Sequence, residues 1–158
     1  MNPNIQKARR LIGVVSLENI RLVEESAHTK VARHQLTEGM KPHFQTSAKP
    51  DGGLSEDGRF FVLAVIELTV ADAPQPPAVT MRAKYELEYS VPGDFKATKA
   101  ELRAFAEVNG AFNAWPYFRE FVQSTSLRMD LPPIILPVYR VPQVHKETPL
   151  ASPSKSSG

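Results

Sequence analysis

The sequence predicts an α+β fold, in which a four-stranded antiparallel sheet is backed by one long helix with a kink. Four stretches between residues 11 and 89 have the composition of strands, and turn-forming residues separate them. A later stretch, residues 98–122, repeats apolar residues at helical spacing. Because all the strands precede the helix, the helix is expected to cover one face of an antiparallel sheet.

The last two strands are the clearest. Residues 79–89 alternate apolar and polar side chains, which predicts a strand with one buried and one solvent-facing side. Residues 60–70 are apolar except near their end, at Glu67 and Thr69, and are predicted to be buried on both faces or nearly so. The segment between them, residues 71–77, contains prolines that interrupt strand pairing, so an antiparallel hairpin is expected.

Two shorter strands are expected upstream. One lies within residues 11–25, and the other spans residues 41–48, with the turn formers of residues 50–53 after it. Four successive strands favour an antiparallel meander. Residues 26–39 show neither a strand nor a helix period and are interpreted as a long crossing loop, which compact domains usually keep for a reason.

The helix is predicted to begin at Thr98, where Glu101 three residues later completes a capping box. Pro116 removes a backbone donor, which predicts a kink near Asn113. The helix has two apolar sides, and one sheet can cover only one of them, so contact with another copy of the protein is expected. The predicted interface residues are Trp115, Tyr117, Phe118 and Phe121.

The domain organisation follows from composition. Residues 1–141 are predicted to form a single domain with loose ends. Residues 142–158 contain mainly proline, serine and charged residues, which bury too little surface to offset the entropy lost on ordering. This tail is therefore predicted to be disordered.

Several classes of function are disfavoured. The formal net charge is only +2 and the charges are scattered, so no nucleic-acid partner is expected. The sequence has no cysteine, no apolar run long enough to insert into a membrane, and no metal-ligand spacing among its histidines. Glu67 is the one tempting general base, but no second polar group accompanies it. We therefore expect a cytoplasmic protein that is not an enzyme and uses no cofactor or metal.

Two segments resemble a known family. Residues 113–120 read Asn-Ala-Trp-Pro-Tyr-Phe-Arg-Glu, and residues 131–138 read Leu-Pro-Pro-Ile-Ile-Leu-Pro-Val. The pair is similar to the signature of the SecB family of protein-export chaperones, in which a Phe-Pro-Tyr-x-Arg-Glu core precedes a Phe-Pro-Pro-Leu-x-Leu-x-Pro-Val segment. Trp115 and Leu131 stand where that family usually has phenylalanine. A fainter resemblance extends over residues 11–141.

The resemblance implies a holdase that keeps unfolded preproteins competent for the Sec pathway and passes them to the SecA motor. It implies a homotetramer built as a dimer of dimers. It also implies a hydrophobic client-binding groove made by the crossing loop, the second strand and the segment after the helix. In this chain the residues expected to line that groove are Leu36, Met40, Phe44, Val138 and Tyr139.

The charge pattern leaves other partners open. The SecB family docks SecA through carboxylates on the sheet, whereas here Arg21, Arg82 and Lys84 lie on the expected strands. One alternative is a SecB-like chaperone dedicated to another partner, such as the antitoxin of a toxin–antitoxin system. Another is a small α+β enzyme whose apolar groove holds a ligand. The sequence does not choose between dimer and tetramer.

Overall fold

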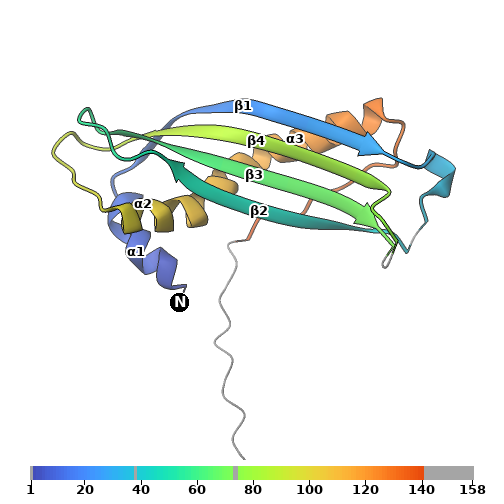
Figure 1. The fold of residues 1–158 in the computed structure, drawn as a ribbon, viewed down its shortest axis with the longest axis horizontal. Coiled ribbons are helices and arrows are strands. Elements are labelled where there is room, and N and C mark those ends of the chain that lie inside the picture. The colour runs from blue at the N-terminus through green and yellow to red at the C-terminus, as the bar shows by residue number, and fades with distance from the viewer. Residues whose placement is uncertain (1, 38, 73–74, 141–158) are drawn as a thin grey trace, which may run out of the picture.

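A computed structural model of the chain describes residues 2–37, 39–72 and 75–140 (Figure 1). The predicted α+β class is confirmed, with a four-stranded antiparallel sheet and a long helix that passes behind it. The elements, in chain order, are α1 (Pro3–Ile12), β1 (Ser16–Thr29), a 3₁₀ turn (Arg33–Gln35), β2 (Lys41–Asp51), β3 (Arg59–Ala71), β4 (Val79–Ser90), α2 (Lys99–Phe105), a π-helical turn (Ala106–Gly110) and α3 (Ala111–Arg128).

The strand order differs from the meander expected from the sequence. The order in the sheet is β1-β4-β3-β2, so β2, β3 and β4 form a meander while β1 pairs with β4. The segment from Lys30 to Met40 crosses one end of the sheet and carries the chain from one edge to the other. The crossing segment is shorter than predicted, because β1 begins at Ser16 and continues to Thr29.

Burial in β3 and β4 defines the two faces of the sheet. Even-numbered residues of β3 from Phe60 to Val70 and odd-numbered residues of β4 from Val79 to Tyr89 are buried on the helical side. The other residues of both strands are half-buried on the opposite face, which we call the outer face. The expectation that β3 is buried on both faces was therefore wrong, because no described element packs over its outer side.

The long helix begins as predicted. Thr98 Oγ1 accepts a hydrogen bond from the Glu101 amide at 3.2 Å, and the Glu101 carboxylate accepts one from the Thr98 amide at 2.8 Å. The helical irregularity lies earlier than expected, at the π-helical turn, and α3 continues as an α-helix through Pro116. A Cβ at Gly110 would lie only 2.6 Å from Ala48 Cβ, so the helix makes its close approach to the sheet there.

The N-terminal end is helical, although the sequence analysis treated it as a loose end. Asn2 caps α1, and Ala8 and Leu11 are fully buried in the core. Arg10 on α1 forms an ion pair with Glu101 on α2 at 2.8 Å. The predicted disordered tail, residues 142–158, and the expected domain end at residue 141 lie outside the described residues.

Candidate functional site

An apolar groove lies where the crossing segment meets the chain that follows α3. It encloses about 380 Å³. We define this apolar groove by the residues that line it: Leu36, Thr37, Met40, Pro42, Val70, Val79, Leu131, Pro132, Pro133, Ile134 and Ile135.

Local sequence explains why the segment after α3 forms one wall of the apolar groove. Asp130 adopts a left-handed backbone conformation with φ of 53°, which reverses the chain at the end of the helix. Leu131 is buried, and the two following prolines cannot donate hydrogen bonds to a sheet edge. Arg33 of the crossing segment pairs with Asp130 at 3.1 Å and so connects the two walls. An extended, unpaired segment therefore faces the crossing segment across an open groove.

Two of the five predicted groove residues, Leu36 and Met40, line this cavity. Phe44 and Tyr139 lie elsewhere, in contact with Trp115, with ring centroids 5.6 Å and 5.2 Å from the tryptophan ring. Val138 is 76% exposed and lies outside the cavity lining. The role of all five in client binding stays a prediction.

The sequence predicts the three segments that supply most of the apolar groove, but not all of the residues that line it. Val70 and Val79 belong to the ends of β3 and β4, where an apolar strand residue gives no sign that it borders a cavity. The segment after the helix was predicted to form part of the groove, but through Val138 and Tyr139 rather than residues 131–135. The signal that points to residues 131–135 is the proline pair, because two adjacent residues without backbone donors disfavour strand pairing while Leu131 and Ile134 still need to pack.

The four predicted interface residues have different surroundings. Trp115, Phe118 and Phe121 are buried within the protomer, whereas Tyr117 is 51% exposed. Tyr117 and Phe121 border a second concave site of about 440 Å³. We call it the β1–α3 groove; its lining residues are Leu22, Glu25, Tyr85, Tyr117, Glu120, Phe121, Ser124 and Arg128. The structure does not test the contact of these residues with a second copy.

The β1–α3 groove has an acidic rim. Burial raises the pKa of the Tyr85 phenol, and the charges of Glu25 and Glu120 raise it further. The Tyr85 side chain is therefore a neutral, largely apolar part of the groove wall at physiological pH. Its ring lies 6.4 Å from that of Tyr117.

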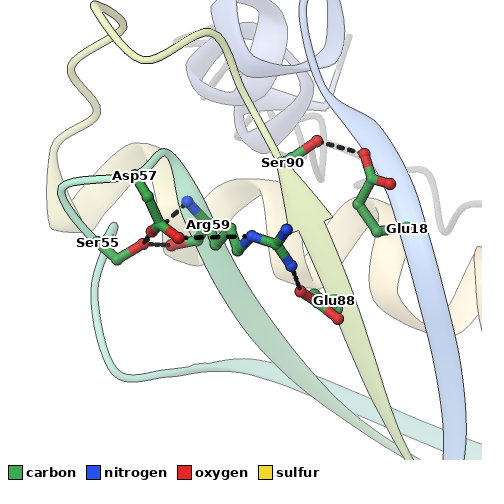
Figure 2. A network of polar contacts seen from close by, with 6 residues as sticks. All are labelled: Glu18, Ser55, Asp57, Arg59, Glu88 and Ser90. Atoms are coloured by element: carbon green, nitrogen blue, oxygen red, sulfur yellow. Dashed lines mark hydrogen bonds and ion pairs between the residues drawn. The ribbon is translucent and has the colours of Figure 1, made fainter.

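On the outer face, cations and carboxylates are paired across strands. Arg21 on β1 contacts Glu86 on β4 at 2.8 Å, and Arg82 on β4 contacts Glu24 on β1 at 2.7 Å. Figure 2 shows the end of this face, where Arg59 reaches from β3 to Glu88 on β4. The same figure shows Asp57 and Ser55 beside Arg59, and Ser90 donating to Glu18 on β1. Most of these carboxylates are thus partly neutralised by neighbouring cations.

No group of three or more histidine, cysteine or acidic side chains in residues 2–37, 39–72 and 75–140 is arranged to hold a metal ion. No helix in the same part of the chain is both long and apolar enough to cross a membrane. His145, the fourth histidine considered from the sequence, lies outside this part.

No family model matches the sequence, and no curated protein matches it. Among solved structures, the chain is similar to the Mycobacterium tuberculosis Rv1957 SecB-like chaperone, which was solved in complex with a ChAD peptide from the Rv1956 HigA1 antitoxin. The TM-score is 0.75 at 23% identity, over 87% of this chain and 98% of the chaperone.

A second solved structure, a protein of unknown function from Streptococcus agalactiae, has a TM-score of 0.48 at 11% identity, over 78% of this chain and 96% of that one. The first covers nearly all of both chains and agrees with the sheet and long helix described above. The chain therefore has the fold of the SecB-like chaperones.

Proposed function

We propose that this protein is a chaperone that holds extended, apolar segments of unfolded polypeptides in the apolar groove. The observation that carries the proposal is the position of this groove, between the crossing segment and the chain after α3. The solved protein with the same fold is a chaperone bound to a peptide, which supports the proposal. We place the activity in the cytoplasm, as the absence of cysteine suggests.

The groove is suited to clients that share apolar character and little else. Its walls are almost entirely aliphatic side chains and prolines, which fit many sequences because they demand no exact polar placement. Burying one aliphatic client side chain contributes about 1.5–3 kcal/mol at most. Several such contacts along one chain are needed for firm holding, and the proposed activity involves no bond making or breaking.

The test replaces groove residues whose side chains are not part of the core. Met40 is half-buried and Ile135 is 84% exposed, so the double variant Met40→Ser and Ile135→Ser is expected to fold normally. We expect the wild-type protein to suppress aggregation of a chemically denatured client without nucleotide. The double variant should need a several-fold higher concentration for the same protection, because two apolar contacts are lost.

The matched control is Leu127→Ser with Ile12→Ser, since these side chains are 71% and 42% exposed and lie outside the groove lining. This control should protect the client as well as the wild type does. A wild-type protein without protection would contradict the proposed function. Equal loss in both double variants would contradict the assignment to the apolar groove.

The client class has two candidates. One is a set of unfolded preproteins held for the Sec pathway and released to SecA. The other is a dedicated partner such as an antitoxin, and the antitoxin peptide bound to the solved SecB-like chaperone favours it. The cross-strand ion pairs of the outer face also favour it, because they leave fewer free carboxylates for a basic docking partner.

We also propose that the protein is a homo-oligomer, a dimer of dimers, and that a second copy covers the β1–α3 groove. β1 is a 14-residue edge strand whose Leu22 and Val23 are exposed, and such long edges are usually covered in native proteins. Half-exposed Tyr117 on α3 borders the same groove. These exposed apolar side chains of β1 and α3 support the β1–α3 groove as the surface for self-association.

A further inference from the structure

A third concave site lies at the opposite end of β2 from the apolar groove. It encloses about 470 Å³ between the last residues of β2, the turn after them, and α2. We call it the basic pocket; its lining residues are Lys49, Pro50, Gly52, Gly53, Lys99, Leu102 and Arg103. Three of these residues are cationic, and none of the described residues that line the pocket is acidic.

The basic character comes from the way α2 separates its charges. Glu101 caps Thr98 and pairs with Arg10 on α1 at 2.8 Å. Glu107, in the turn after α2, accepts a hydrogen bond from Asn4 on α1. Both carboxylates are thus used on the side of the helix that faces α1.

The other side of α2 carries the two cations. Lys99 and Arg103 are four residues apart, which places them on one side of the helix. Both are exposed, and neither forms an ion pair within the part of the chain that the structure describes. Their charges are therefore available to an anion from outside the protomer.

Apart from its three cations, the lining of the basic pocket is uncharged. Buried Leu102 lies between the two cations in the sequence. Gly52 has φ of 84°, a conformation that suits glycine, and a Cβ at Gly52 or Gly53 would have no atom within 4 Å. Asp51 does not contribute to the lining.

The two sites lie at the two ends of one edge strand. Pro42 lines the apolar groove and Pro50 lines the basic pocket, and the eight residue steps of extended strand from one to the other span roughly 26 Å. Among residues 2–37, 39–72 and 75–140, β2 has one strand partner, β3, so its other edge offers no further strand pairing within this part of the chain and can accept an extended chain. An extended polypeptide needs about eight residues to reach from one site to the other.

We infer that the basic pocket binds carboxylates of an acidic segment of the same polypeptide client whose apolar segment lies in the apolar groove. This inference rests on the proposed function. It predicts that the preferred client has an acidic stretch about eight residues from its apolar stretch. Because the cations are exposed, their contribution is expected to select among clients and to weaken with salt.

The test uses two fluorescent peptides of about 19 residues, each with the same apolar stretch of about eight residues, the same spacer of about eight residues and a three-residue end. One ends in Glu-Asp-Glu and the other in Gln-Asn-Gln. We expect the wild-type protein to bind the acidic peptide about three- to tenfold more tightly at low ionic strength, from two or three exposed charge contacts. The preference should disappear in the double variant Lys99→Gln and Arg103→Gln.

The control variant Lys84→Gln with Arg119→Gln removes the same charge from the outer face and from α3, and it should keep the preference. Equal affinity of the wild type for both peptides would overturn the inference while leaving the proposed function intact. Failure to bind either peptide would instead count against the proposed function. Loss of the preference in both double variants would show a general charge effect and would also overturn the inference. A further outcome is that both peptides bind equally, while inorganic phosphate binds the wild type but not the variant Lys99→Gln with Arg103→Gln. This outcome would show a site for a free anion and would also overturn the inference.

Discussion

Trp115 connects three parts of the molecule through a single side chain. Its indole nitrogen donates a hydrogen bond to the Pro137 carbonyl at 2.8 Å, which fixes the chain after α3 against the helix. Its ring contacts Phe44 from β2 and Tyr139 from the segment after α3. Trp115, which the sequence predicts at an oligomer interface, therefore makes these contacts within the protomer. There it supports the extended segment that also lines the apolar groove.

Gly110 is required by the close approach of the helix to the sheet. In Gly110→Ala, the new methyl would lie 2.6 Å from Ala48 Cβ and 3.0 Å from Val62 Cγ1. Ala48 Cβ cannot move without the backbone, so overpacking should outweigh the gain in helix propensity. We expect the free energy of unfolding to fall by about 1–3 kcal/mol in urea titrations.

The control for this prediction is Gly93→Ala, where a Cβ would have no atom within 4 Å. It should leave the unfolding midpoint almost unchanged. An unchanged or raised midpoint in Gly110→Ala would mean that the helix does not approach β2 this closely.

Tyr89 should lower the free energy of unfolding at alkaline pH. Burial raises its pKa to about 12, although the hydrogen bond that its hydroxyl accepts from Asn113 at 2.8 Å opposes the shift. The unfolded chain loses this proton from about pH 10, so stability is unaffected below that pH and falls as pH rises from about 10 to 12. The contribution to the loss is about 1.4 kcal/mol per pH unit across this window.

The measurement is the urea midpoint of wild type and Tyr89→Phe at pH values between about 8 and 12. The variant should be less stable at neutral pH, since it lacks the hydrogen bond, but should decline less steeply above pH 10. Parallel decline of the wild type and Tyr89→Phe would count against the prediction.

At the scale of elements, β1 and β4 determine the electrostatic character of the outer face. The register of β1 and β4 places Arg21 directly opposite Glu86. Arg82 pairs with Glu24 although these two residues do not lie directly opposite each other in the register. These pairs are largely exposed and contribute little stability. Their main consequence is for encounter with a charged partner, because they reduce the negative potential of the face.

We therefore expect weak binding of SecA from the same organism. Changing both Arg82 and Lys84 to glutamate should strengthen binding several-fold by removing two cations that repel a basic docking surface. The gain should shrink at high ionic strength, because exposed charges are screened over about 10 Å at 0.1 M. Titration of SecA at two salt concentrations measures both effects.

The control changes Lys7 and Arg9 to glutamate, which gives the same charge difference on α1, away from the sheet. An equal gain in this control would indicate a non-specific charge effect. Tight, salt-insensitive binding by the wild type would mean that Arg82 and Lys84 lie outside the contact, and it would support the export role.

At the scale of the whole molecule, self-association should depend on the β1–α3 groove. Tyr117→Glu introduces a charge at a half-exposed position beside the acidic residues Glu25 and Glu120, so it should dissociate the oligomer without unfolding the protomer. Leu127→Glu, at a 71% exposed residue outside this groove, should not. Sedimentation equilibrium gives the mass, and circular dichroism checks that both variants are folded. A wild-type monomer at micromolar concentration would contradict the proposed assembly.

The sequence determined the local structure where a short-range rule applies. Alternation in residues 79–89 requires one buried face, and the Thr98–Glu101 capping box needs only four neighbouring residues. The predicted α+β class also followed from the order of these elements. The helix α1 was missed because its amphipathic character depends on two buried residues, Ala8 and Leu11.

Only the tertiary structure decided which elements become neighbours. The sequence has no local signal that β1 pairs with β4, because the crossing segment that carries the chain to the far edge shows no period of its own. Burial of Trp115 and Phe118 depends on which side of the helix the sheet covers, and the hydrophobic pattern allows two. The apolar groove and the basic pocket arise from distant segments, 36–42 with 131–135 and 49–53 with 99–103. A concave site of this kind is a property of packing, since no single segment contains more than one of its walls.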